Sequence, residues 1–250
     1  MSPPGCPARL QSPPTSGGAP PHFRLSHLSK MAAPALEQLL TELLEPDSAG
    51  IRQATARLRE ALEEPETGEG LVVLLKEAER PQVRHLAAIL LRKLLRKLPD
   101  DLIDRLPQAV VEALERDNDV SSWGSLAQLG ARLLLLGGPK FWEPMEKWMR
   151  EAAREPQKME GALRFLGVAA GVAGPALSGC GPAPLTLLRA GLGAGKGAGT
   201  LGAALGALGA LVGAGGGVWL RSLLPEALGA LRELLRSEQV RSVLTLGGSG

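Results

Sequence analysis

The stretch Pro81–Leu98, PQVRHLAAILLRKLLRKL, decides the fold of this chain. Proline suits the first position of a helix, because the N–H that it lacks would have no partner there. Apolar residues then recur at the spacing of one helix face, and they are Val83, Leu86, Ala87, Leu90, Leu91, Leu94 and Leu98. Because this apolar stripe is wide, we expect neighbouring helices to cover it on more than one side.

Similar helical patterns precede and follow this stretch, and they come in pairs. The second helices of the pairs begin near Ser48, Pro81, Asp119 and Pro156, at intervals of 33, 38 and 37 residues. A period of this size with short turns is typical of a HEAT-type α-solenoid, in which each pair packs on the next. We therefore predict an all-α fold with about four HEAT-type helix pairs. An ordinary helical bundle is the alternative.

The composition divides the chain into four parts. We expect residues 1–33 to be a disordered Pro/Ser-rich extension and residues 34–174 to hold the helix pairs. Residues 175–220 form a Gly/Ala-rich low-complexity segment, which we expect to be flexible because small side chains leave little surface to offset the entropy of ordering. Residues 221–250 fit a partial helical repeat.

Charge is unevenly distributed. The predicted helical part holds 19 Lys and Arg against 23 Asp and Glu, so we expect no direct binding of nucleic acid. The polar side of the central helix is nevertheless basic, with Arg84, Arg92 and Arg96 nearly in line. These arginines could bind acidic groups of a partner. A solvated helix face with glutamate neighbours is the simpler interpretation.

Nothing in the sequence indicates an enzyme, a metal site or a bound cofactor. The cysteines Cys6 and Cys180 and the three histidines lack metal-ligand spacing. Gly195-Lys196 suggests a P-loop, but Ala190 stands where that motif needs glycine and Gly197 where it needs Ser or Thr. The N-terminal residues lack the apolar stretch of a secretory signal.

Two further features have more than one interpretation. Trp123, Phe141, Trp142 and Trp148 could line a peptide groove, although packing in the core is favoured because aromatic rings have large areas to bury. The 24 uncharged residues of Gly197–Leu220 are long enough to span a membrane. Their nine glycines make that segment only weakly hydrophobic, so we do not favour a membrane span.

Several short runs resemble the N-terminal part of one protein family. They are Leu36–Leu40, Glu42–Leu44, Pro46-Asp47, Ile51-Arg52, Ala54-Thr55, Gln82–Arg84, Ala87-Ala88, Leu90 and Ser125–Leu129. In order and spacing they resemble nuclear transport receptors of the importin-beta family, over roughly Ala35–Ala170. Many members place a tryptophan where this chain reads Leu98-Pro99-Asp100. Members also have many more repeats, so we expect most of a cargo-binding surface to be missing.

The resemblance implies a function in nuclear import. Receptors of the family are HEAT solenoids that bind the GTP form of the small GTPase Ran, carry protein cargo with basic localisation signals and contact Phe-Gly nucleoporins. They work in the cytoplasm and nucleus. The resemblance implies a Ran-binding surface that includes Arg84, Arg92, Arg96 and Gln128. The alternatives are a helical-repeat adaptor that does not bind Ran and, more remotely, a Gly-rich membrane-anchored protein.

Overall fold

The computed structural model describes residues 33–236 apart from residues 46, 65, 117–122, 178–179, 181, 194, 217–220, 230 and 233–234. The extension predicted to be disordered therefore lies almost wholly outside the described residues, as do residues 237–250 of the predicted partial repeat.

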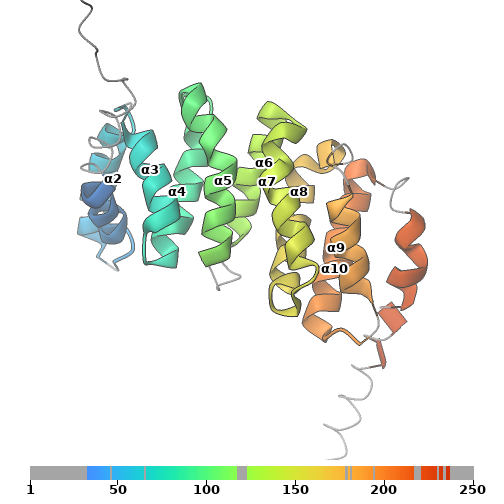
Figure 1. Cartoon of the computed structure of the whole chain (residues 1–250). Coiled ribbons are helices and arrows are strands. Elements are labelled where there is room, and N and C mark those ends of the chain that lie inside the picture. The colour runs from blue at the N-terminus through green and yellow to red at the C-terminus, as the bar shows by residue number, and fades with distance from the viewer. Residues whose placement is uncertain are drawn as a thin grey trace, which may run out of the picture.

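The described residues are mostly helical and include no strand (Figure 1). A first helix covers residues 33–42, and helical residues also lie between 224 and 236. The main elements between them are α2 (Ser48–Ala61), α3 (Thr67–Glu77), α4 (Pro81–Leu94), α5 (Asp100–Arg116), α6 (Trp123–Gly137), α7 (Pro139–Ala152), α8 (Pro156–Leu177), α9 (Ala183–Leu192), α10 (Ala198–Leu211), the π-helical turn η1 (Val212–Gly216) and the 3₁₀ turn η2 (Arg221–Leu223).

The helices from α3 onward form two layers. One layer consists of α3, α5, α7 and α9, and the other consists of α4, α6, α8 and α10, with each helix packed on the next member of its layer (Figure 1). Consecutive helices such as α3 and α4 or α9 and α10 pack across the layers. Contacts therefore run mainly between near neighbours in the chain, which confirms the predicted all-α, HEAT-like solenoid.

Helix starts follow from local chemistry. Asp47 precedes α2, and its side chain accepts hydrogen bonds from the backbone N–H groups of Ala49 (3.1 Å) and Gly50 (2.9 Å). Such a cap satisfies N–H groups that have no partner within the helix. Pro81 occupies the first turn of α4, as predicted.

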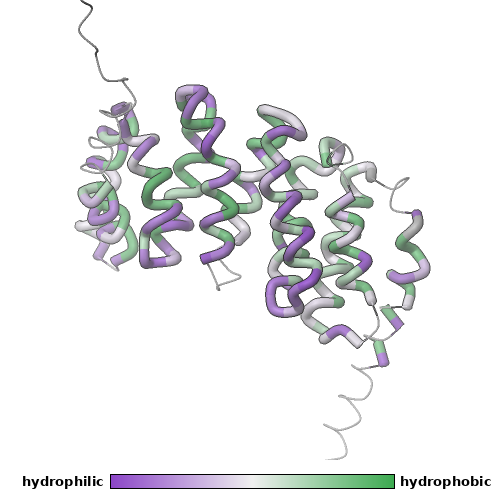
Figure 2. The backbone as a smooth tube through the Cα atoms, in the orientation of Figure 1, coloured by the Kyte–Doolittle hydropathy of each residue, from purple (hydrophilic) through white to green (hydrophobic). Residues whose placement is uncertain are grey.

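The core lies between the layers and contains the predicted stripe of α4. Val83, Ala87 and Leu91 are fully buried, and Leu90 is 8% exposed. Figure 2 shows hydrophobic and hydrophilic residues alternating along α3 to α7, as expected for helices that bury one face each.

Trp123, Trp142 and Trp148 also belong to this core. Trp142 stacks on Phe165 with ring centroids 6.0 Å apart, and Trp148 meets the edges of Phe165 (5.4 Å) and Trp123 (5.7 Å). All three tryptophans are buried, which confirms the interpretation that they pack in the core. Phe141 is only half-buried and lies beneath Lys140, whose Nζ is 5.7 Å from the ring centroid.

The prediction that residues 175–220 would be flexible was wrong for the described residues. Helix α8 continues past a bend at Ala173 (φ −132°, ψ 25°) to Leu177, and α9 and α10 then pack on α7 and α8. Small residues allow this packing because backbones approach closely: a Cβ added to Gly167 would lie 3.3 Å from the Cα of Ala207. Buried leucines at helical spacing complete the contact, and they are Leu187, Leu188, Leu192, Leu201, Leu208 and Leu211.

Candidate interaction surface

Arg84 does not lie on the exposed side of α4. Its side chain is only 4% exposed, and its Nη1 donates hydrogen bonds to the carbonyl oxygens of Ala78 (2.6 Å) and Glu79 (3.1 Å). Side chains in the first turn of a helix lean back towards its N-terminus, so Arg84 reaches the loop that joins α3 to α4. The expectation that Arg84 projects with Arg92 and Arg96 was therefore wrong, and Arg84 has a structural role instead.

Arg92 and Arg96 line a groove between the ends of α4 and α6. This groove has a volume of about 550 Å³ and includes Lys93, the buried Leu95 and three residues of α6, which are Arg132, Leu135 and Leu136. We call it the basic groove, since its lining contains four cationic side chains and no carboxylate. None of these four cations takes part in an ion pair within the described part of the chain.

Two exposed leucines accompany these charges. Leu135 is 50% exposed and Leu136 is 51% exposed. The apolar spacing of Trp123, Leu126, Leu129, Leu133 and Leu136 predicts a buried stripe on α6 that would include Leu136. Leu133 and Leu134 already complete that stripe, and α6 ends one residue after Leu136. Arg132, Leu135 and Leu136 were therefore missed as surface residues, and the nearby end of the helix at Gly137-Gly138-Pro139 was the available signal.

Helices α4 and α6 pack side by side, and the basic groove lies at their C-terminal ends. Besides their apolar contacts, the ring Nδ1 of His85 lies 2.9 Å from the hydroxyl oxygen of the buried Ser125. Gln128 lies on α6 one turn before Arg132 and is half-buried. It shares a helix face with Arg132 but does not line the groove, so the structure places only Arg92 and Arg96 of the predicted site residues together there.

A second groove adjoins the basic groove at Arg96 and Leu136. Its volume is about 490 Å³, and it is lined by Leu95, Arg96, Leu98, Asp100, Ile103, Asp104, Leu136, Gly137 and Phe141. Asp104 lies 3.8 Å from the ammonium group of Lys140. We call this second depression the adjoining groove. The charges of the basic groove are all cationic, whereas the adjoining groove has Arg96 together with Asp100 and Asp104.

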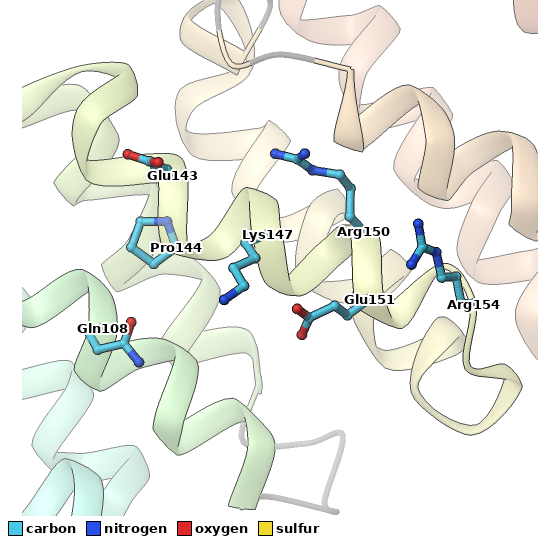
Figure 3. Close-up of a pocket in the computed structure, with 7 residues that line it drawn as sticks. All are labelled: Gln108, Glu143, Pro144, Lys147, Arg150, Glu151 and Arg154. Atoms are coloured by element: carbon cyan, nitrogen blue, oxygen red, sulfur yellow. The ribbon is translucent and has the colours of Figure 1, made fainter.

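The opposite layer has a groove of mixed charge (Figure 3). It has a volume of about 550 Å³, and Gln108 of α5 faces side chains of α7 and the following turn, which are Glu143, Pro144, Lys147, Arg150, Glu151 and Arg154. Arg150 is paired with Glu146 at 3.1 Å. Because both signs of charge line this groove, it has no clear preference for an acidic or a basic ligand.

Candidate metal ligands and one buried thiol can be compared with what such sites require. The described residues include no group of three or more His, Cys, Asp or Glu side chains placed to hold a metal ion. Cys180 is buried, its thiol donates to the carbonyl of Ala176, and burial together with the charge of Glu146 raises its pKa to about 11. A thiol with this pKa stays protonated at neutral pH and is a poor nucleophile.

One described segment is long and apolar enough to cross a bilayer. Ala198–Gly215 has a mean hydropathy of 1.5, and 28% of its residues are buried. One face of this segment packs on α8, whereas added Cβ atoms at Gly202, Gly206 and Gly209 would meet no atom within 4 Å. Length and composition of a single helix are weak evidence for a membrane span, because core helices pass the same test.

Comparison with known proteins identifies relatives of this chain. The chain is 38% identical to human Importin-4 over 116 residues, which are 45% of this chain, and 35% identical to mouse Importin-4 over 141 residues, which are 53% of it. The chain is related to the importin-beta family. The resemblance found in the sequence is thereby confirmed.

The similarity covers only a small part of each relative. The matched part of this chain spans only 11% of human Importin-4 and 13% of mouse Importin-4. No family model matches the chain, and no solved structure matches it.

Proposed function

We propose that this chain acts by binding other proteins, as part of a nuclear import receptor of the importin type, and that it is not an enzyme. The observation that carries the proposal is its similarity to Importin-4. The two-layered solenoid supports it, because stacked helix pairs offer an extended surface for partners.

The first proposed partner is Ran in its GTP form. It would dock on the second helices of the first pairs, α2, α4 and α6. Arg92, Arg96 and Gln128 remain as candidate contacts, whereas Arg84 is engaged in the loop between α3 and α4. Exposed charges of this kind mainly change the rate of association and are screened by salt, so the binding should be sensitive to salt.

The other proposed partners are protein cargo with basic localisation signals and Phe-Gly nucleoporins, in the cytoplasm and nucleus. The predicted helical part carries 23 acidic against 19 basic side chains, which suits a basic signal. The basic groove would repel such a signal, so cargo would bind elsewhere on the solenoid.

A binding experiment with the full chain tests the first partner. Ran loaded with a non-hydrolysable GTP analogue should bind, and Ran loaded with GDP should bind much more weakly. Arg92→Glu/Arg96→Glu should weaken the binding without loss of helicity. The matched control is Lys147→Glu/Arg154→Glu, which makes the same charge change on the opposite layer and should leave the binding unchanged.

Two results would contradict the Ran proposal: equal binding of both nucleotide forms, or undiminished binding of the folded Arg92→Glu/Arg96→Glu variant. Absence of any Ran binding would favour a helical-repeat adaptor that binds proteins without the GTPase.

A further inference from the structure

We propose that the basic groove binds an acidic segment of a partner protein, and that the adjoining groove takes an apolar side chain of the same segment. This inference concerns a different ligand from Ran or basic cargo, and it does not depend on the proposed import function.

The charges of the basic groove indicate the sign of the ligand. Arg92, Lys93, Arg96 and Arg132 come from two neighbouring helices and converge on one groove. Because no described carboxylate pairs with them, an incoming acidic segment would not have to displace an existing ion pair. Three of the four side chains are exposed and Arg92 is half-buried, so all four can reach a ligand at the surface.

The apolar lining indicates that the ligand carries more than charge. Leu135 and Leu136 are each about half exposed, next to the cations. The adjoining groove adds the half-buried Leu98 and Phe141 and, at its base, the buried Ile103, so the exposed apolar surface is mainly that of Leu135 and Leu136. Large apolar side chains exposed together beside charged groups are typical of protein contact sites. An apolar residue of the ligand that covers Leu136 would remove this surface from water.

Asp100 and Asp104 set the direction of the segment and exclude other ligands. They line the adjoining groove and not the basic groove, and Asp104 is already paired with Lys140, so the acidic residues of the ligand fit the basic groove. A nucleic acid carries evenly spaced phosphates and would meet these carboxylates. A basic peptide would be repelled by the four cations instead.

The dimensions fit a short extended segment. Packed helices lie about 8–10 Å apart, and an extended chain advances about 3.3 Å per residue, so about three residues would pass from α4 to α6. Side chains that alternate along an extended segment would then place every second residue towards the groove. About eight to ten residues would suffice to cover both grooves.

Fluorescence anisotropy with the full chain tests the inference. The probe is a labelled peptide of about ten residues, with alternating Asp and Glu in one half and Leu-Phe in the other, made in both orders. It should bind in a salt-sensitive manner, and one order should bind more tightly than the other. Peptides with Lys in place of the acids, or with Ser-Ser in place of Leu-Phe, should bind more weakly.

Two variants assign the binding to its two grooves. Arg92→Glu/Arg96→Glu should weaken binding by about tenfold or more, since two attractions become repulsions. Leu136→Ser should lower the affinity for the Leu-Phe peptide and leave the affinity for the Ser-Ser peptide unchanged. Lys147→Glu/Arg154→Glu, on the opposite layer, is the matched control and should bind both peptides as the unaltered chain does. Circular dichroism should show equal helicity for all variants.

Several outcomes would overturn the inference. They are failure of the acidic peptide to bind in either order, undiminished binding by the folded double arginine variant, equal binding of the Lys peptide, and equal binding of a single-stranded RNA of the same length. The assay contains no GTPase, so its failure leaves the Ran proposal standing, and failure of Ran to bind leaves this inference standing.

Discussion

The Nη1 of Arg84 lies 2.6 Å from the carbonyl oxygen of Ala78, so this arginine joins the start of α4 to the end of α3. Its neighbours on the same helix, Arg92 and Arg96, line the basic groove. One helix thus carries arginines with two separate functions: one stabilises the turn between two helices, and the others remain available to a partner.

Arg84→Ala should lower the free energy of unfolding by about 2–4 kcal/mol, because it removes hydrogen bonds from a charged group and leaves the buried carbonyl of Ala78 without that donor. Arg92→Ala should change it by less than about 1 kcal/mol, because no ion pair or hydrogen bond of its side chain is lost. Urea denaturation of both variants measures the difference. Equal effects would show that the Arg84 hydrogen bonds contribute little.

Leu90→Asp should destabilise the solenoid by several kcal/mol. Leu90 is 8% exposed and belongs to the continuous core, so the substitution would bury a carboxylate without a partner. Thermal unfolding followed by circular dichroism should show a clear fall in Tm. Leu135→Asp is the matched control, because Leu135 is 50% exposed and its substitution should change Tm little. A small effect at Leu90 would mean that its surroundings admit water.

Two glycine-to-alanine substitutions should have opposite effects. A Cβ at Gly161 would lie 1.9 Å from the ring of Trp123, which Trp148 holds in place, so Gly161→Ala should destabilise the chain by about 1–3 kcal/mol. A Cβ at Gly202 of α10 would meet no atom within 4 Å, and Gly202→Ala should stabilise by about 0.5–1 kcal/mol through helix propensity. If Gly202→Ala leaves Tm unchanged, α10 is not a stable helix in solution.

Cys180 should make stability fall at alkaline pH. Its pKa is raised from 9.0 to about 11 in the folded chain, so above pH 9 the unfolded state loses the proton first. The stabilisation is complete below pH 9 and decreases by about 2–3 kcal/mol as the pH rises to about 11. Urea denaturation of the unaltered chain and of Cys180→Ala, compared at each pH, isolates this contribution.

The same pKa predicts slow thiol chemistry. In a Cys6→Ser background, Cys180 should react with a disulfide reagent at pH 7.5 far more slowly than a free cysteine in a peptide, because few molecules carry the thiolate. A rate equal to that of the peptide would show that the site opens readily or that the pKa is not raised.

Helix periodicity predicted the solenoid because each helix buries one face. The buried residues therefore recur every three or four positions, as Val83, Ala87 and Leu91 do. The direction of a charged side chain is less predictable. Arg84 and Arg92 lie on the same helix, yet the carbonyls of the preceding loop decide that Arg84 turns inward. Those carbonyls are placed by tertiary structure, which a helical pattern does not describe.

Composition was misleading where glycine was abundant. Few charges and small side chains suggested a flexible segment after Pro175, but small residues also let two helices meet at backbone distance. Gly167 and Ala207 are in contact in this way between α8 and α10. A glycine-rich segment is flexible when no helix packs on it, and it allows close packing when a neighbouring helix is present. The basic groove was predicted only in part. Arg92 and Arg96 could be read from one helix, but Arg132 lines the same groove only because α6 packs on α4.

The helices of the solenoid differ in how many residues they bury, and this difference predicts which of them unfold first. Helix α2 buries only Ala54 and Leu58, whereas α5, α6 and α8 each bury residues along most of their length. Because a stack is held by neighbour contacts alone, its weakest member can open without disturbing the rest. The helical residues between 224 and 236 are also weakly held, because Ala227 is the only buried side chain among those described there. Gentle heating should therefore open the molecule first at α2 and at this C-terminal part, and amide protons should exchange with solvent earliest in both places.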